Sequence, residues 1–449
     1  MGLVAKLADR LRSHKLSRDI AWTLGSFVLL AASGMVINLV VAGVRDAAAL
    51  GVFNQAYAVY IIASQLATLG LHYSVLRHAA LHEADEAVRG RMFFTAAVCA
   101  LALGVLAALV VGFGAGAFAA LFDSPATGRA IAWAATGLTL FSLNKVLLAY
   151  LNGLRHMKAF SILQGLRYLM VMAVVCAVAA SPWPIERITV GFLAAEVVTA
   201  AAAIGFLARR RLARHLGFDR AWLAQHVRFG SKGLAAGMFA EFNSRIDVLL
   251  IGVFLPDREV GIYSFAAMMV DGVYHVLAMI RINFNPVLVG ALRDGDHAQA
   301  TALRRQSARW VLPATAAMAL AAVGALWVLS TFVVPHKDLH EGMPSLLILM
   351  SGLVLVSALV PFDNLLMVSG HPGYQTLQQL ATVAANAAVA VALLPLWGIA
   401  GAATGTAISY LAGAMALLLF SRRIVGWNLL ANRFEKAGPS AAVPVGGDR

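Results

Sequence analysis

Ten ionisable side chains lie inside long apolar stretches of this sequence. A charged group near the centre of a bilayer costs about 2.5–3.5 kcal/mol on insertion scales, so such residues are candidates for binding or ion coupling. Five are basic and five are acidic: Lys145, Arg167, Lys232, Arg245 and Arg281, and Glu196, Glu241, Asp247, Asp271 and Asp363. They point either to recognition of a charged ligand or to ion pairs that hold helices together.

The densest group lies between residues 241 and 247. Glu241 and Arg245 are four residues apart, so on one helix they share a face and can pair. Asp247 lies about 200° around that helix from Arg245 and needs another partner. One interpretation is a helix that lines a polar cavity and offers Arg245 to an anionic group. The other is an internal network of ion pairs.

A second group follows in the next apolar stretch. Asp271 and His275 are also four residues apart, and a carboxylate beside an imidazole can bind and release a proton near neutral pH. A structural hydrogen bond is the alternative. Arg281 precedes Asn283 and Pro286, and the proline predicts a kink or break whose freed carbonyls need partners. Arg281 is therefore expected either to line a cavity or to donate hydrogen bonds to the carbonyls freed at that break.

Lys145 and Asp363 occupy similar places in the two halves of the chain and could form a gate across a cavity. Arg77 lies at the end of an apolar stretch, where snorkelling to the interface is the usual explanation. A phosphate headgroup entering from the cytoplasm is the alternative partner for Arg77.

Motifs for several other chemistries are not found in the sequence. It has no Walker A loop, no HExxH motif and no paired cysteine ligands, since Cys99 and Cys176 lie apart in apolar stretches. We therefore expect no enzyme activity, no cofactor and no bound metal. The net charge of +13 sits in short loops between apolar stretches, which argues against a nucleic-acid partner.

The elements that carry these residues are predicted to be membrane-spanning helices. Only 13% of residues are charged and the mean hydropathy is +0.78, whereas soluble chains carry about 25% charged residues. A span needs roughly 20 apolar residues. Twelve stretches qualify: 20–44, 51–76, 92–121, 130–152, 159–180, 187–208, 230–254, 260–290, 310–334, 344–369, 374–395 and 398–420.

The distribution of basic residues gives these spans a direction. With the N-terminus inside, the inner segments hold 25 Lys and Arg and the outer loops hold five. Cytoplasmic loops are enriched in Lys and Arg, so both termini are predicted to be cytoplasmic. The expected segments are 1–19 (cytoplasmic, with no cleavable signal), 20–208 (first bundle), 209–229 (cytoplasmic linker), 230–420 (second bundle) and 421–449 (cytoplasmic tail).

The two halves of the chain resemble each other. Leu50–Phe53 opens the second predicted span and Val260–Tyr263 opens the eighth, 210 residues later. Six spans return the chain to the same side, so the halves form parallel repeats. The expected fold is all-α, with about twelve transmembrane helices in two six-helix bundles around a central cleft.

Three places in the sequence resemble bacterial polysaccharide-transport proteins, which include O-antigen and exopolysaccharide flippases. The segments 50–54 and 69–77 resemble their second span, and 245–252 with 260–263 resemble their seventh and eighth spans. Pro395–Ala403 resembles the entry to their last span. The resemblance covers nearly the whole chain in layout and implies the fold of multidrug and lipid-linked saccharide exporters.

The resemblance also implies a function. The substrate would be a polyprenyl-diphosphate-linked oligosaccharide, moved to the outer leaflet of the bacterial cytoplasmic membrane for surface polysaccharide synthesis. Arg245 and Arg77 match the family's motifs as contacts for the anionic headgroup, whereas Lys145 and Arg281 are added from their position in the membrane. Glu241, Asp247, Asp271, His275 and Asp363 are the candidates for ion coupling or gating.

The expected partners are the lipid-linked oligosaccharide and the phospholipid bilayer, with a polysaccharide polymerase and other assembly proteins as further candidates. A cation-coupled multidrug exporter of the same superfamily is the main alternative. An intramembrane polymerase or glycosyltransferase is disfavoured by the short outer loops. A scaffold without transport activity is the weakest alternative.

Overall fold

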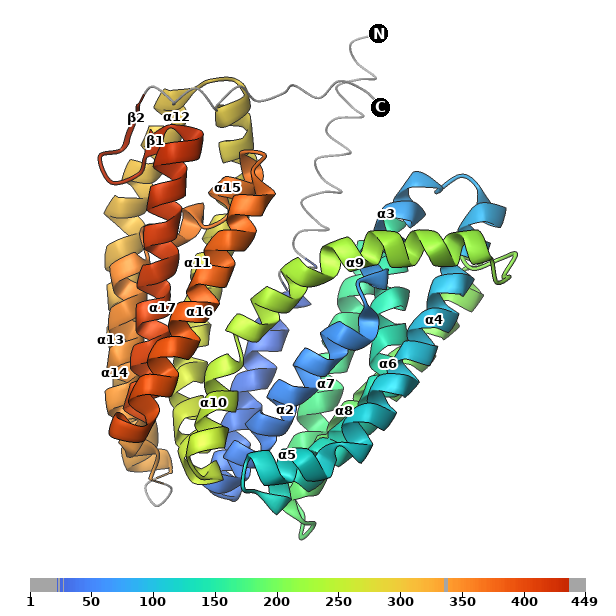
Figure 1. The fold of residues 1–449 in the computed structure, drawn as a ribbon. Helices are drawn as coiled ribbons and strands as arrows, with labels where there is room; N and C mark the ends of the chain where they lie inside the picture. The colour runs from blue at the N-terminus through green and yellow to red at the C-terminus, as the bar shows by residue number, and fades with distance from the viewer. Residues whose placement is uncertain (1–21, 23–24, 27, 335–337, 436–449) are drawn as a thin grey trace. The chain divides into compact units, whose positions relative to one another are not determined.

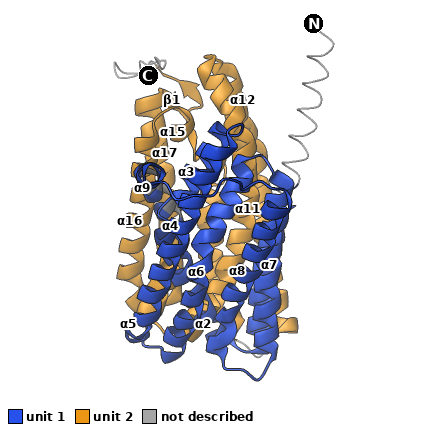
Figure 2. Cartoon of the chain, turned by 90° about the vertical axis from the view of Figure 1, so that its right-hand side faces the viewer, with its two compact units in different colours: residues 1–241 blue, residues 242–449 orange. Residues whose placement is uncertain are grey.

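The computed structural model describes residues 22–435, apart from 23–24, 27 and 335–337. The chain divides into two compact units, Met1–Glu241 and Phe242–Arg449 (Figure 2). In the described part, ten helical stretches are long and apolar enough to cross a membrane, and Val28–Val44 is a shorter apolar helix. The protein is thus an all-helical, multi-pass membrane protein. One pair of two-residue strands is the exception among the described elements.

Unit 1 contains the helix Val28–Val44 and nine further helices or helical segments. They are α2 (Ala47–Thr68), α3 (Leu71–Leu81), α4 (Glu86–Phe113), α5 (Ala115–Leu121), α6 (Pro125–Gly153), α7 (Met157–Ala180), the 3-10 helix η1 (Ile185–Thr189), α8 (Val190–Arg209) and α9 (Arg220–Asn243). Figure 1 shows their order along the chain.

Short polar side chains fix where several of these helices begin. Asp46 accepts a hydrogen bond from the backbone N–H of Ala49 at 2.7 Å, and Asp85 caps α4 in the same way. Ser124 caps α6, whose first residue is Pro125. Each oxygen satisfies an N–H that has no partner within its helix, so the turns before α2, α4 and α6 are set locally.

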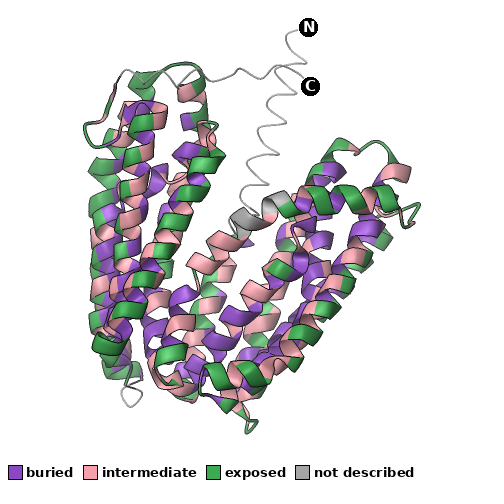
Figure 3. Cartoon of the chain, viewed as in Figure 1, coloured by how far each residue is buried: buried purple, intermediate pink, exposed green. Residues whose placement is uncertain are grey.

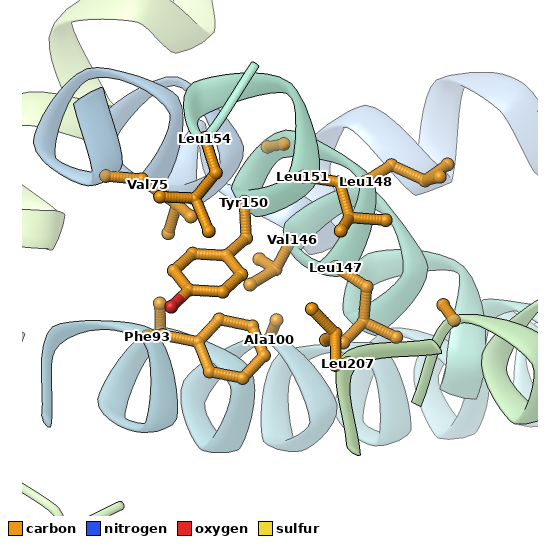
Figure 4. Close-up of a cluster of buried hydrophobic side chains, with 14 of the residues drawn as sticks. Val75, Phe93, Ala100, Val146, Leu147, Leu148, Tyr150, Leu151, Leu154 and Leu207 are labelled. Carbon is orange, nitrogen blue, oxygen red and sulfur yellow. The ribbon is translucent and has the colours of Figure 1, made fainter. Parts of the chain in front are cut away.

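The centre of unit 1 is α6, which packs against α2, α3, α4 and α8. Tyr150 of α6 is fully buried and stacks on Phe93 of α4 with ring centroids 4.3 Å apart (Figure 4). Figure 3 shows that many residues of the helices around α6 are exposed or of intermediate burial. Apolar outer faces such as that of α4 suit contact with lipid.

The second predicted span is interrupted, because α2 ends at Thr68 and α3 begins at Leu71. Leu69 and Gly70 between them are both left-handed, with φ of 46° and 68°. Helix α9 crosses at this point, and a Cβ on Gly70 would lie 2.2 Å from the carbonyl oxygen of Gly230. Only glycine permits both this backbone conformation and this close approach.

The segment before α9 is held on the end of unit 1. The Tyr150 hydroxyl donates to the carbonyl of Leu212 at 2.7 Å, and the N–H of Asp219 donates to Thr95 at 2.9 Å. A Cβ on Gly90 would collide with the carbonyl of Arg214. Residues 212–219, predicted as part of a linker, therefore pack against α4 and α6.

Unit 2 begins with α10 (Ile246–Phe254) and the long α11 (Asp257–Arg293). The following elements are α12 (His297–Gln306), the π-helix η2 (Ser307–Val311), α13 (Leu312–Val328), the π-helix η3 (Leu329–Val333), the 3-10 helix η4 (Leu339–Gly342), α14 (Met343–Val356), the 3-10 helix η5 (Val360–Phe362), α15 (Leu365–Val368), α16 (Pro372–Trp397), α17 (Ile399–Phe420) and the π-helix η6 (Ser421–Val425). Strands β1 (Trp427–Asn428) and β2 (Arg433–Phe434) pair antiparallel, with Trp427 opposite Phe434.

Two further predicted spans are interrupted. The seventh is divided, since α9 ends at Asn243 and α10 begins at Ile246. The tenth changes from α14 to short segments around Pro361. Proline lacks the N–H that would bond to the carbonyl of Ser357, and its ring crowds that carbonyl, so a regular helix cannot continue there. Of the kink or break predicted at Pro286, the break is wrong, because α11 runs through this residue as one helix, and the kink stays a prediction.

Candidate functional site

In unit 1, a chain of hydrogen bonds links three helices through Lys145, Gln65 and Glu241. The Lys145 Nζ on α6 donates to Gln65 Oε1 on α2 at 2.9 Å. The Gln65 Nε2 donates in turn to Glu241 Oε1 on α9 at 2.9 Å. The amide thus separates the ammonium from the carboxylate. In the described part of the chain, Lys145 has no carboxylate oxygen within 4.0 Å.

A buried ion pair lies beside this chain. Arg167 Nε on α7 is 3.5 Å from Glu196 Oε1 on α8, and Glu196 is 2% exposed. Asn144 Nδ2 on α6 donates to Glu196 Oε2 at 2.7 Å and to its backbone carbonyl at 2.8 Å. These contacts compensate the Glu196 carboxylate and connect α6, α7 and α8.

Phe141 connects the two groups. Lys145 Nζ lies 5.1 Å from the centroid of the Phe141 ring and the Arg167 guanidinium lies 4.8 Å from it. Both distances are those of cation–π contacts. Two cations are thus gathered around one aromatic ring, and one of them is neutralised by Glu196.

The predicted gate between Lys145 and Asp363 stays a prediction. Lys145 is bonded to Gln65 within unit 1, and Asp363 is paired with Arg281 within unit 2. Each side chain has a partner in its own unit, which the sequence alone did not indicate.

In unit 2, Arg281 and Asp363 form an ion pair next to the interruption before α15. Arg281 Nη1 lies 3.1 Å from Asp363 Oδ2 and also contacts the hydroxyl of Tyr274 at 3.4 Å. Gln378 Nε2 on α16 donates to the other carboxylate oxygen of Asp363 at 2.8 Å. Arg281 therefore contacts side chains here, rather than carbonyls freed by Pro286.

Asp247 has the separate partner that its position on the helix required. The Tyr263 hydroxyl donates to Asp247 Oδ2 at 2.6 Å, and the N–H of Val248 donates to Oδ1 at 2.9 Å. The Tyr263 oxygen also lies 3.3 Å from the hydroxyl of Thr406. Asp247 is 9% exposed, so α10, α11 and α17 meet at a buried carboxylate.

His275 contacts the backbone of Asp271, and proton binding by His275 beside the Asp271 carboxylate stays a prediction. His275 Nδ1 lies 2.5 Å from the backbone carbonyl of Asp271. Arg245 interacts electrostatically with both Asp271 and Asp247. These four residues are therefore near one another in unit 2.

The predicted sharing of a helix face by Glu241 and Arg245 is wrong. Arg245 lies in the interruption, immediately before α10, while Glu241 belongs to the last turn of α9. The spacing of four residues has no fixed geometric meaning across a break in the helix. Arg245 belongs to unit 2 and Glu241 to unit 1.

Arg77 lies near one end of unit 1, on α3. It is exposed, and its guanidinium lies 5.0 Å from the ring centroid of Phe229 on α9. The side chain of Lys232, another basic residue predicted within a span, lies outside the described part of the structure.

Buried histidine side chains join α3 to α9 outside the candidate spans. His226 Nε2 lies 3.1 Å from the carbonyl of Met92 and its Nδ1 lies 2.8 Å from the hydroxyl of Ser74. A carbonyl only accepts, so Nε2 carries the hydrogen of a neutral ring. The pKa of His226 is lowered to about 4, mainly by burial. The bond to Met92 raises this pKa in part, and nearby His78 contributes to lowering it.

Groupings typical of metal sites do not occur among the described residues. No cluster of three or more His, Cys, Asp or Glu side chains there could hold a metal ion.

Neutral side chains are the functional partners that the sequence did not reveal. Gln65, Gln378 and Tyr263 each contact an intramembrane charge. Amide and phenol side chains are common in apolar helices and carry no charge, so the sequence does not single them out as contacts of a buried charge. Asn144 was visible beside Lys145, but its partner Glu196 lies 52 residues away.

The fold is that of known transporters. An inward-facing multidrug resistance MATE-family transporter of the MOP superfamily matches with a TM-score of 0.70 and 13% identity, over 88% of this chain and 94% of that one. The lipid II flippase MurJ, in an inward closed conformation, matches with a TM-score of 0.72 and 11% identity, over 90% and 87%. A MOP-superfamily transporter from Pyrococcus furiosus, described as having a binding pocket of reverse polarity, matches at 0.59 and 13%, over 90% and 93%.

These observations define a helical membrane protein with the fold of MOP-superfamily transporters and with a charge pair inside each unit. Residues 40–334, well over half of the chain, match a family described as polysaccharide biosynthesis protein, and the chain belongs to this family. No curated protein matches the sequence at a significant level.

Proposed function

We propose that the protein is a flippase for a polyprenyl-diphosphate-linked oligosaccharide. It would move this lipid from the inner to the outer leaflet of the bacterial cytoplasmic membrane, for O-antigen or exopolysaccharide synthesis. The family and the transporter fold support a transport step in polysaccharide biosynthesis. The proposal includes twelve spans in two six-helix bundles around a central cleft, with both termini in the cytoplasm and no enzymatic step.

The environment of Lys145 carries this proposal. An ammonium has three N–H donors, and Gln65 takes one of them in the described structure. The nearest compensating carboxylate, Glu241, is bonded to that same amide. Lys145 can therefore bind an incoming anion without first breaking a direct ion pair, unlike Arg167 and Arg281, which already contact carboxylates.

The proposed cycle follows from this difference. Arg77, exposed beside Phe229, is the first contact of the diphosphate at the cytoplasmic side. The diphosphate then binds Lys145, while Arg245 and Arg281 are candidate contacts from unit 2. Glu241 loses part of its compensation when the anion replaces Gln65, so it is the residue we expect to take up a proton. Asp247, Asp271, His275 and Asp363 remain candidates for ion coupling or gating.

Substitution of Lys145 tests the proposal. We expect Lys145→Ala to reduce surface polysaccharide roughly tenfold to a hundredfold, because a hydrogen bond to a charged group contributes about 1.5–3 kcal/mol. Lys145→Arg should retain part of the activity. The measurement is surface polysaccharide in a host lacking the gene, with protein level in the membrane determined in parallel and lipid-linked oligosaccharide quantified in extracts.

The matched control is Lys158→Ala, since Lys158 is an exposed lysine at the start of α7. It should leave polysaccharide unchanged. Normal polysaccharide in Lys145→Ala would exclude Lys145 as a substrate contact. Loss of polysaccharide without accumulation of the lipid-linked precursor would argue against a flippase.

A cation-coupled multidrug exporter is the alternative, because the MATE-family likeness is as close in fold. A site for cationic drugs needs an available carboxylate. The Glu196 carboxylate accepts a hydrogen bond from Asn144 and pairs with Arg167. Asp247 and Asp363 each accept hydrogen bonds from two protein groups. Efflux of a cationic dye that depends on one of these carboxylates would favour the exporter.

A further inference from the structure

The segment Ser421–Glu435, here named the C-terminal cap, folds onto one end of unit 2 (Figure 1). Its backbone and side chains are bonded to α12. Arg304 Nε donates to the carbonyl of Leu429 at 3.1 Å, and Asn432 Nδ2 donates to the carbonyl of Thr301 at 2.9 Å. Within the cap, the N–H of Glu435 donates to the carbonyl of Gly426 at 2.7 Å. The cap is thus an ordered part of unit 2.

A column of five rings runs from the cap into the helices. His297 of α12 stacks on Phe434 at 3.8 Å between centroids, and Phe434 stacks on Trp427 at 5.0 Å. Trp427 meets Phe362 edge to face at 5.7 Å, and Phe362 meets Phe284 of α11 at 5.9 Å. Trp427 and Phe362 are fully buried, so the column is part of the core of this end.

The inner end of this column lies beside the ion pair of unit 2. Phe362 is followed directly by Asp363, and Phe284 lies one turn after Arg281 on α11. Asp363 is at the end of an interrupted stretch, where a regular helix does not hold the backbone in place. Packing against Phe362 is therefore a means of fixing where the Asp363 carboxylate lies relative to Arg281.

We propose that the C-terminal cap is a positioning element for the Arg281–Asp363 pair, and that Trp427 is its central positioning residue. Trp427 contacts Phe362 and not the charges themselves. Removing the indole leaves Phe362 without its largest neighbour from the cap, so the stretch 357–364 gains freedom and the 3.1 Å contact between Arg281 and Asp363 loosens. The importance of this pair for transport rests on the proposed function, whereas the mechanical coupling does not.

Hydrogen–deuterium exchange of the purified protein in lipid nanodiscs tests the coupling. Trp427→Ala is expected to speed exchange severalfold in residues 357–369 and to leave α6 of unit 1 unchanged. Trp427→Phe, which keeps an aromatic ring in the column, should restore most of the protection. Leu430→Ala is the matched control, because Leu430 lies between the two strands and is 72% exposed.

The proposal would be overturned if Trp427→Ala speeds exchange in the cap but leaves protection from exchange in residues 357–369 at the wild-type level. If Trp427→Ala is not recovered from membranes, Phe434→Leu replaces it, since Phe434 contacts Trp427 from within the cap. The same two outcomes apply to that variant.

A double-mutant cycle on surface polysaccharide tests whether the coupling acts through the pair. We expect Trp427→Ala and Asp363→Asn each to reduce polysaccharide severalfold at unchanged protein level, and the double variant to be no worse than Asp363→Asn. If the double variant instead loses polysaccharide by the product of the two single losses, the effect of Trp427 does not act through Asp363. If exchange changes as expected but polysaccharide does not respond to any variant, the coupling stands and the proposed role of the pair in transport fails.

Discussion

Lys145 and Arg167 both lie within cation–π distance of Phe141, but their other neighbours suit them to different roles. Arg167 is 3.5 Å from the buried carboxylate of Glu196, so its charge is already compensated. Lys145 donates to the neutral amide of Gln65. Breaking a buried ion pair leaves an uncompensated charge, whereas displacing an amide does not. Arg167 therefore suits a structural role and Lys145 suits a binding role.

Removal of Arg167 should destabilise the protein strongly. Arg167→Met leaves Glu196 buried and without its cation, which costs about 3–5 kcal/mol in comparable pairs. The double variant Arg167→Met with Glu196→Gln should recover much of the loss, since a glutamine oxygen can still accept from Asn144. Thermal unfolding in one detergent measures both effects.

The control for that measurement is Arg228→Met, which removes an exposed arginine of α9. Its Tm should stay close to that of the wild type. A Tm for Arg167→Met equal to that of the control would show that the pair contributes nothing to stability.

For single residues, the sequence indicates which charged side chains lie in apolar stretches but not which side chains they contact. All five acidic and five basic residues were recognised from their apolar surroundings. Partners such as Gln65 and Tyr263 were not, because neutral polar side chains are unremarkable in a helix and pairing depends on how helices pack. The shared helix face inferred from spacing is wrong for Glu241 and Arg245, because a break in the helix separates them.

At the scale of elements, hydropathy predicted where helices lie better than where they break. The apolar stretches correspond to helices such as α4, α6 and α16. The interruption at Gly70 was not predicted, because it depends on the crossing of α9 at Gly230, 160 positions later in the chain. Pro361 was a local signal for the interruption before α15, while Pro286 gave the same signal and left α11 continuous.

The junction of α3 and α9 should loosen in acid. The folded protein lowers the pKa of His226 to about 4, below the ordinary value of 6.5, so the folded state binds fewer protons than the unfolded state. The stabilising contribution is complete above pH 6.5 and is lost as pH falls towards 4. Burial also lowers the pKa of His78, and the nearby groups Arg77 and His82 lower it further, which adds to this effect.

Protection factors from hydrogen exchange in residues 71–81 and 220–230, measured between pH 7 and pH 4.5, check this prediction. His226→Gln cannot gain a charge and should show a weaker dependence on pH. Equal dependence in both proteins would mean that His226 does not titrate in this range.

At the scale of the whole molecule, the positions of Lys and Arg predict how the chain is oriented. Inner segments hold 25 of these residues and outer loops hold five. We therefore predict that both termini are cytoplasmic, and six spans in each half would make the two halves parallel repeats.

Reporter fusions test this orientation. A phosphatase that is active only outside the cytoplasm should be inactive when fused after Glu435 and active when fused after Ser181, at similar expression levels. The fusion after Glu435 leaves the C-terminal cap complete. Phosphatase activity in the fusion after Glu435 would mean that the topology is the inverse of the predicted one. Arg77 would then lie on the opposite side of the membrane from the proposed entry of substrate.

The C-terminal cap also has a consequence for the order in which the protein is made. Domains generally fold in sequence during synthesis. The contacts of α9 with α3 and α4 lie within unit 1, so they can form once α9 has emerged. The cap follows α17 along the chain, so the contact between Phe362 and Trp427 can form only after every helix up to α17 has been translated. The Arg281–Asp363 region is therefore the last part to mature, and a ribosome stalled after α17 would leave a protein with its helices in place but this region unfinished.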